Sequence, residues 1–375
     1  MHFSLRRCAV LLALAAAVPA ALAASPYAVA TRPVGIVAPA GESTIAFDIN
    51  AAGQVAAVLQ DEEGRQRGVL FDNGKLTEIG SPDGLYSDAR AINTGGMIVG
   101  SASHKNGTWS AFLFERANGM RELPTLGGPS SYGMAINDAG HAVGFADTPS
   151  GDWHAFLYRG GATLTDLGTL GGKISYAAGM NNVGQVVGTA TDAHDYRHAF
   201  VFTEGQGMRD LGTLGGRQSS ATAINDGGVI VGASETKDRR WHAFIHDGKR
   251  MVDLGALIGV GSSFATDINN KGHVVGTVLL PDERMSFVWR DGKMRVHRGG
   301  KGLHLTNSIN EAEQVIGATY DLRMEAATMP SNAIPAVARS GNKLFFFMGL
   351  VLVLAAAGVA YRQHFKQVKA PTLAG

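Results

Sequence analysis

Three histidines whose side chains could bind a metal ion or transfer protons recur at one spacing. The motif His-Ala-Phe begins every 44 residues, and an aspartate follows each copy, which gives the pairs His154 and Asp166, His198 and Asp210, and His242 and Asp253. A metal ion needs its ligands within about 2 Å, but residues in the same slot of successive repeats lie apart. We therefore predict no metal site, and expect each histidine to be buried and hydrogen-bonded to the aspartate of its own repeat.

The densest cluster of ionisable side chains lies in the segment TDAHDYRH, which contains Asp192, His194 and Asp195. Acid–base catalysis requires two carboxylates, or a histidine and a carboxylate, in one pocket. A solvated loop has the same composition, and we favour that interpretation. The sequence has no glycine-rich phosphate loop that opens a helix, and no G-x-S-x-G nucleophile elbow between a strand and a helix. It therefore predicts no catalytic residues and no cofactor.

These side chains belong to a repeat that is marked by an asparagine after an apolar residue. The spacings between its copies are 43, 44, 44, 44, 44 and 41 residues, and the copies are Asn50, Asn93, Asn137, Asn181, Asn225, Asn269 and Asn310. A glycine stands three positions after the asparagine in six copies, and another stands seven positions after it in six copies. One period over the whole chain indicates a repeat architecture, in which the asparagine and the first glycine form a turn.

One copy, residues 131–172, is interpreted as four short strands. Ser131 to Ile136 and His141 to Ala146 flank the asparagine turn. A polar loop leads to the nearly continuously apolar third strand, Trp153 to Arg159, and a glycine turn leads to the fourth, Thr163 to Leu170. Four strands in about 44 residues, with no stretch of helical period, are typical of a β-propeller blade. Strands that are apolar on both faces suit blades that pack face to face.

The ends of the repeat region predict how the ring closes. Two strands follow Asn310 before Pro330, and Pro33 to Pro39 occupies the fourth-strand position ahead of Asn50. The N-terminal segment can therefore complete the last blade and remove an exposed sheet edge. We predict an all-β fold, a seven-bladed β-propeller of four-stranded repeats over residues 33–330, closed by an N-terminal strand. An open β-solenoid is the alternative, because stacked repeats share this signature.

The two ends of the chain are predicted to be targeting segments. Residues 1–23 are expected to be a signal peptide, since Arg6 and Arg7 precede a short apolar run and Ala21 to Ala23 is a small-x-small cleavage site. An uncleaved anchor helix is the alternative. The single cysteine, Cys8, lies in this segment, so no disulfide is expected in the mature protein. Residues 24–32 are a lead-in to the propeller.

Residues 344–361 form an uncharged stretch of 18 residues, enough for a transmembrane helix across a bilayer core of about 30 Å. The basic residues that follow, in 362–375, predict a cytoplasmic tail. The body would then face outward on the linker 331–343, in the periplasm or on the cell surface. A buried core helix is the alternative at this length, and cleavage of the span during surface sorting stays open.

The charge of the body argues against nucleic acid as a partner. Five of the 33 basic residues lie in the terminal segments, which leaves 28 basic against 32 acidic residues in 24–343. A mildly acidic body with no basic run lacks the clustered Lys and Arg that phosphate binding needs.

The recurring motifs resemble those of the bacterial extracellular HAF-repeat family. The residues that carry the resemblance are the three His-Ala-Phe motifs, the AIN turn and the DLGTLGG stretches at Asp166 to Gly172 and Asp210 to Gly216. The resemblance covers about residues 34–329 and implies an exported repeat scaffold in the envelope of a Gram-negative-type bacterium, with no known reaction and no catalytic residues. The end repeats depart from the pattern, because Arg67 and Glu325 stand where histidine is expected.

Function is expected where the copies differ. The loops between the second and third strands are variable and polar, and propeller geometry places them on one face with the connections between blades. The candidate ligand-binding residues in and beside these loops are Trp109, Trp153, Asp192, His194, Asp195, Tyr196, Arg197, Arg239, Arg240 and Trp241. For the three tryptophans we favour packing between blades over ligand contact.

The sequence therefore predicts a membrane-anchored propeller that acts as a monomeric binding or interaction scaffold for an unknown envelope protein or glycan. A carbohydrate-active hydrolase or lyase that uses the same face is the alternative. A purely structural envelope protein is the third interpretation.

Overall fold

A computed structural model describes residues 34–36, 42–84, 86–259, 261–281, 283–298, 303, 305–321 and 323–330. The predicted signal peptide (1–23), lead-in (24–32), linker (331–343), transmembrane helix (344–361) and tail (362–375) lie outside these residues. Within the described part, no helix is long and apolar enough to cross a membrane.

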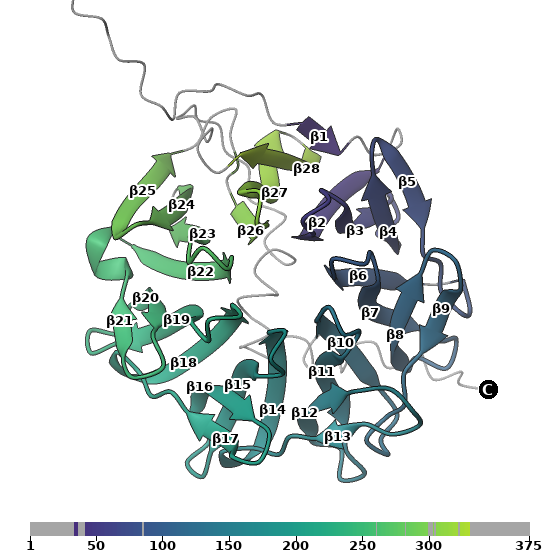
Figure 1. Cartoon of the computed structure of the whole chain (residues 1–375), viewed down its shortest axis with the longest axis horizontal. Coiled ribbons are helices and arrows are strands. Elements are labelled where there is room, and N and C mark those ends of the chain that lie inside the picture. Colours follow the sequence, from purple (N-terminus) through teal and green to yellow (C-terminus); the bar gives the residue numbers. More distant parts are fainter. Residues whose placement is uncertain are drawn as a thin grey trace, which may run out of the picture.

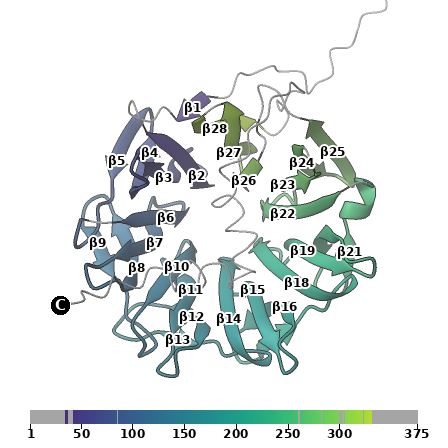
Figure 2. The ribbon, with the colours of Figure 1, turned by 180° about the vertical axis from the view of Figure 1, so that it is seen from behind.

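The described strands form seven four-stranded antiparallel sheets arranged as blades around a central axis (Figures 1 and 2). The innermost strands are β2 (Ser43–Ile49), β6 (Ser87–Ile92), β10 (Ser131–Ile136), β14 (Gly171–Met180), β18 (Gly215–Ile224), β22 (Ser262–Ile268) and β26 (Leu305–Ile309). The second strands are β3 (Val55–Gln60), β7 (Ile98–Ser103), β11 (Ala142–Asp147), β15 (Val186–Asp192), β19 (Ile230–Thr236), β23 (Val274–Leu279) and β27 (Gln314–Asp321).

The third strands are β4 (Gln66–Asp72), β8 (Trp109–Glu115), β12 (Trp153–Tyr158), β16 (Arg197–Thr203), β20 (Trp241–His246), β24 (Arg284–Arg290) and β28 (Arg323–Pro330). The outermost strands are β5 (Lys75–Glu78), β9 (Gly119–Glu122), β13 (Thr165–Asp166), β17 (Gly207–Asp210), β21 (Met251–Asp253), β25 (Lys293–Arg298) and β1 (Val34–Ile36). A single 3₁₀ helix, η1 (Gly255–Leu257), occurs in the described residues. The predicted all-β propeller is confirmed, but β13 is shorter than the predicted strand Thr163 to Leu170.

Both ends of the repeat region contribute to one blade, as the sequence predicts. β1 pairs antiparallel with β28, with Gly35 opposite Ala327, and the sheet order is β1-β28-β27-β26. Figure 1 shows β1 beside β28 on the outside of the ring. We number the blades one to seven from β2–β5 to this shared blade.

The core lies between neighbouring blades. A phenylalanine from the third strand of five blades is fully buried, namely Phe112, Phe156, Phe200, Phe244 and Phe287. Seven of the eight clusters of buried side chains draw on two adjacent blades. One of them joins Val143 and Leu157 of the third blade to Val186 and Phe200 of the fourth. Because neither face of a blade meets water, its strands are apolar on both faces, as the His-Ala-Phe strands are.

The seven repeat asparagines form a closed ring of hydrogen bonds. Each side chain accepts a bond from the backbone N–H four residues later and donates from Nδ2 to the backbone carbonyl of the next asparagine, at 2.9–3.3 Å. The last bond runs from Asn310 back to Asn50. All seven side chains are buried. The asparagine therefore shapes its own turn, as predicted, and also links neighbouring blades, which the sequence analysis did not foresee.

A buried serine is hydrogen-bonded to the third strand of the preceding blade at the alanine of the Ala-Phe pair, which stands in Ser-Ala-Phe in the second blade and in His-Ala-Phe in the next three. The backbone N–H of this alanine donates to a serine Oγ of the next innermost strand, in the pairs Ala111 and Ser131, Ala155 and Ser175, Ala199 and Ser219, and Ala243 and Ser263, at 2.8–2.9 Å. This serine recurs six residues before the asparagine and is a further signal of the repeat in the sequence. The third strand of one blade is thus fastened to the first strand of the next.

Candidate functional site

The variable loops meet the inter-blade connections on one side of the ring, as predicted; we call this side the loop face. Five of the loops, 61–65, 104–108, 148–152, 192–196 and 236–240, are closed by the same backbone hydrogen bond from their first residue to their last. The connections lie against them: Asp147 N–H donates to Ser130 O, Leu170 bridges to Asp192, and Leu214 bridges to Thr236.

The histidine–aspartate pairs lie where the third and fourth strands reach the loop face. The Nδ1 atoms of His154, His198 and His242 lie 2.8, 2.6 and 2.9 Å from the carboxylates of Asp166, Asp210 and Asp253. The predicted pairing within each blade is confirmed. The predicted burial holds only for His242, which is 6% exposed; the other two are half-buried because the ends of their strands are open to solvent.

Asp210 controls the ionisation of His198. The hydrogen bond from Asp210 raises the pKa of His198 above its usual value, and burial opposes this shift. We expect Asp210→Asn to lower the pKa of His198, measured by NMR titration of the histidine ring protons. His246, whose pKa is lowered by burial and by the charge of Arg209, should titrate unchanged. A His198 pKa that does not respond to Asp210→Asn would contradict the assignment of the pair.

The tryptophans pack between blades, which is the interpretation we favoured from the sequence. Trp109 stacks on Tyr132 of the next blade with ring centres 5.9 Å apart, and Trp241 stacks on Phe264 at 6.2 Å. Trp153 contacts Tyr176 of the next blade edge-on at 5.7 Å. All three tryptophans are half-buried. These ring contacts join neighbouring blades beside the loop face.

Two candidate residues adopt a backbone conformation that favours glycine. Asp195 and Arg239 have φ of 63° and 60°, at the loop position where Gly107 and Gly151 stand in the second and third blades. A left-handed residue other than glycine costs of the order of 1 kcal/mol. The fourth and fifth blades have a strained residue at this loop position, and each loop therefore has a charged side chain at its tip, Asp195 in the fourth blade and Arg239 in the fifth.

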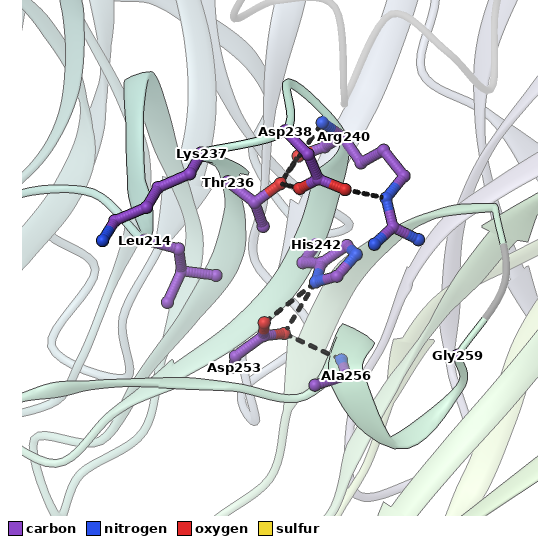
Figure 3. A pocket seen from close by; sticks show the side chains of 9 residues that line it. All are labelled: Leu214, Thr236, Lys237, Asp238, Arg240, His242, Asp253, Ala256 and Gly259. Atoms are coloured by element: carbon purple, nitrogen blue, oxygen red, sulfur yellow. Dashed lines mark hydrogen bonds and ion pairs between the residues drawn. The ribbon is translucent and has the colours of Figure 1, made fainter.

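A pocket opens on the loop face of the fifth blade (Figure 3). Its volume is about 450 Å³, and its lining residues are Leu214, Thr236, Lys237, Asp238, Arg240, His242, Asp253, Ala256 and Gly259. The third and fourth blades are followed by DLGTLGG connections, whereas the fifth is followed by DLGALIGVG. This connection forms η1 instead of bridging to the next loop.

The polar side chains of the pocket are held in place by one another. Thr236 Oγ1 donates to Asp238 at 2.5 Å and Arg240 Nε donates to the same carboxylate at 2.6 Å; these two bonds lower the pKa of Asp238 to about 2. Asp253 accepts bonds from His242 Nδ1 and from the backbone N–H of Ala256. Figure 3 shows Lys237 and Arg240 on opposite sides of the His242–Asp253 pair.

The structure spreads the ten predicted residues over four adjacent blades. Trp109 belongs to the second blade, Trp153 to the third, Asp192 to Arg197 to the fourth, and Arg239 to Trp241 to the fifth. Asp192 is occupied in shaping its own loop, where it accepts bonds from the backbone N–H groups of His194 and Tyr196. Tyr196 is exposed, and Arg217 lies over its ring at 5.6 Å.

Only Arg240 of the ten lines the pocket. The other polar lining residues were absent from the predicted site, and the changed connection after Asp253 was the signal that could have pointed to them. No group of three or more His, Cys, Asp or Glu side chains suited to a metal ion occurs in the part of the chain that the structure describes.

A second polar cluster lies on the innermost strands where the ring closes. Ser308 Oγ is 2.8 Å from Asp48 Oδ1 and 2.7 Å from Asp267 Oδ2. A hydroxyl has one proton, so Ser308 can donate to only one of these carboxylates, and the other contact requires a proton on the second carboxyl. In agreement, burial and the charge of Asp48 raise the pKa of Asp267 to about 7.

This carboxyl makes stability depend on pH. The folded state holds the Asp267 proton up to about pH 7, whereas the unfolded chain releases it near pH 4, so its contribution to stability falls as pH rises between these values. Asp267→Asn removes the titration and keeps a donor to Ser308. We expect the free energy of unfolding of this variant relative to wild type, measured by urea denaturation, to rise between about pH 4 and about pH 7, by at most about 1.4 kcal/mol per pH unit.

Asp192→Asn provides a control of opposite sign. Its loop N–H bonds outweigh desolvation and lower the pKa of Asp192, so this variant should lose stability relative to wild type as pH rises through the range where Asp192 ionises. A pH-independent difference between Asp267→Asn and wild type would contradict the shared-proton arrangement.

Comparison with known proteins supports the fold. No family model and no curated protein match the sequence. The chain is similar to a puromycin-hydrolysing peptidase from Mycobacterium tuberculosis at 12% identity, with a TM-score of 0.56 over 82% of this chain and 54% of that one. It is similar to an acylaminoacyl peptidase from Pyrococcus horikoshii at 15% identity, with a TM-score of 0.51 over 88% and 54%. The chain thus spans about half the length of these two proteins. At such identities the likeness shows a β-propeller and nothing of its activity.

Proposed function

We propose that this protein is an exported, membrane-anchored propeller that binds its ligand on the loop face, in the pocket of the fifth blade. The pocket carries the proposal, because it lies where the repeat departs from its own pattern and where fixed polar side chains converge. Concave sites with a few convergent polar groups are the usual form of small-ligand sites. The regular features, the asparagine ring and the buried serines, hold the blades together and leave the loops free to vary.

The proposed location rests on the two ends of the sequence. The signal-peptide pattern in 1–23 and the apolar stretch in 344–361 with its basic tail support export with the body outside the inner membrane. The resemblance to the HAF-repeat family supports the same environment. An envelope protein or a glycan is the proposed source of the ligand.

The ionisation of two loop-face carboxylates, Asp238 and Asp192, weighs against their use as the acid of a hydrolase. A glycoside hydrolase needs one carboxylic acid that keeps its proton near neutral pH. Hydrogen bonds to Thr236 and Arg240 lower the pKa of Asp238 instead, and loop N–H groups lower that of Asp192 despite its desolvation. These carboxylates suit fixed ionic contacts better than proton donation.

A glycan and peptide array tests the proposal. Purified full-length protein should bind a subset of the array, and a Lys237→Ala/Arg240→Ala double variant should reduce this binding at least about tenfold. Arg250→Ala is the matched control, since this arginine is also exposed but lies on the turn at 247–250, between the third and fourth strands of the same blade. Binding to nothing, or binding that the double variant leaves intact, would contradict a ligand site in this pocket.

A further inference from the structure

We infer that the fifth-blade pocket receives an anionic group, a carboxylate or a phosphate, on a ligand about the size of a sugar. The inference rests on the proposed function and names the chemistry of the ligand. It follows from which hydrogen-bonding groups of the pocket are already used and which are left for a ligand.

The acceptors of the pocket are engaged. One oxygen of Asp238 accepts from Thr236 and the other from Arg240 Nε. The carboxylate of Asp253 faces His242 Nδ1 with both oxygens, at 3.0 and 2.9 Å, and one of them also accepts from the Ala256 N–H. A ligand that offers mainly hydroxyl donors would have to share these oxygens with the partners that they already have.

The donors of the pocket are available. Lys237 makes no hydrogen bond or ion pair through its ammonium group with any residue that the structure describes. Among the residues that the structure describes, the Arg240 side chain bonds only to Asp238, through Nε, so the two terminal nitrogens of its guanidinium group are left for a ligand. Ammonium and guanidinium donors give their strongest hydrogen bonds to carboxylate and phosphate oxygens.

The stem of the exposed Lys237 side chain lies against the backbone at the edge of the pocket. The aliphatic stem of Lys237 passes over Gly215, so closely that a Cβ on this glycine would lie 2.7 Å from Lys237 Cγ. The loop 236–240 contains Lys237, Arg239 and Arg240 against the single acid Asp238. The charged lining residues balance, with Lys237 and Arg240 against Asp238 and Asp253. The exposed Arg239 of the same loop adds one positive charge beside the pocket, which attracts an anion and is screened by salt.

The volume agrees with a small ligand. About 450 Å³ is within the range of small-molecule sites, about 300–1,000 Å³. Lys237 and Arg240 stand on opposite sides of the pocket (Figure 3), so each offers its own place for an oxyanion at the edge of the pocket.

Isothermal titration calorimetry of the full-length protein tests the inference with four probes: glucuronic acid, glucose 6-phosphate, inorganic phosphate and glucose. We expect at least one acidic probe to bind at least tenfold more tightly than glucose, and its affinity to fall as salt increases. Lys237→Ala should weaken this binding about fivefold or more, and Lys237→Glu should abolish it. Lys249→Ala, an exposed lysine on the turn between the third and fourth strands of the same blade, should have no effect.

The arms of the experiment separate the possible results. Tighter binding of glucuronic acid would show that the pocket binds a carboxylate, and tighter binding of glucose 6-phosphate would show that it binds a phosphate. If inorganic phosphate binds as tightly as glucose 6-phosphate, the pocket recognises the phosphate group and not the sugar. Glucose bound as tightly as the acidic probes, or no acidic probe bound at 10 mM, would overturn the inference. The proposed function would still hold after that result if binding of an array ligand depended on Lys237 and Arg240. It would be wrong as well if no array ligand depended on these two residues.

Discussion

Replacing Asn181 with alanine is expected to lower the free energy of unfolding by about 3 kcal/mol. The side chain is 3% exposed. It accepts from Gln185 N–H at 2.9 Å and donates to Gln185 Oε1 at 2.9 Å and to the Asn225 carbonyl at 3.0 Å. Alanine leaves the Gln185 N–H without its partner, and the Asn225 carbonyl keeps only its bond from the Gly228 N–H. A buried polar group that loses its partner costs about 1–3 kcal/mol, and the lost bond between blades adds to this cost. Urea denaturation followed by tryptophan fluorescence measures the change.

The next residue in the chain provides the control. Asn182 also bridges to neighbouring turns, through Asp138 and Asp226, but it is exposed. Water can replace these bonds, so Asn182→Ala should cost less than about 1 kcal/mol. Equal losses for the two variants would show that the ring of asparagine bonds contributes no more than surface contacts.

Gly144→Ala is expected to destabilise the protein by about 3 kcal/mol or more, or to prevent it from accumulating in soluble form. An added Cβ would lie 1.8 Å from the Tyr132 carbonyl oxygen and 2.9 Å from its carbon. Both atoms are backbone of the neighbouring strand, so relief requires β10 and β11 to move apart. The first blade has Ala57 at this position, opposite Ala46, so a methyl group is tolerated only where the strand pair is spaced for it.

Gly161→Ala separates this clash from the general effect of losing a glycine. Gly161 has φ of 85° and nothing within 4 Å of an added Cβ. Its replacement should cost only the strain of a left-handed alanine, about 1–2 kcal/mol. Thermal unfolding of the two variants should therefore differ by several degrees. A Gly144→Ala protein as stable as Gly161→Ala would show that the strands separate easily.

The sequence predicts the blade well because each of its features is local and repeated. The strands, the asparagine turn and the histidine–aspartate pairs fall within one period, and β1 beside β28 follows from the missing fourth strand. The contact of Asp48 with Asp267 through Ser308 could not be predicted in this way. These aspartates are 219 residues apart and become neighbours, through the seventh blade, only because the ring closes.

The candidate site was predicted less well, since a site depends on a departure from the repeat. The variable, aromatic and charged loop positions predict Arg240 as a site residue, but they do not single out Lys237 and Asp238 beside it. The pocket exists because the connection after Asp253 forms η1, and no property of the loop residues themselves reveals that space. Positive φ at Arg239 is likewise a property of the backbone that the residue type conceals.

The pairing of β1 with β28 also sets an order of events. Of the strands that the structure describes, the one at Val34–Ile36 is synthesised first and its partner at Arg323–Pro330 is synthesised last. The first strand therefore stays unpaired for longer than any other. Until the two meet, β28 has an unpaired edge that can recruit a strand from another chain. Closing so long a loop adds little entropy cost relative to a shorter one but delays completion of the ring. A fusion partner or tag joined just before residue 34 would therefore act on the final step of folding, and a chaperone that bound this strand would keep the ring open.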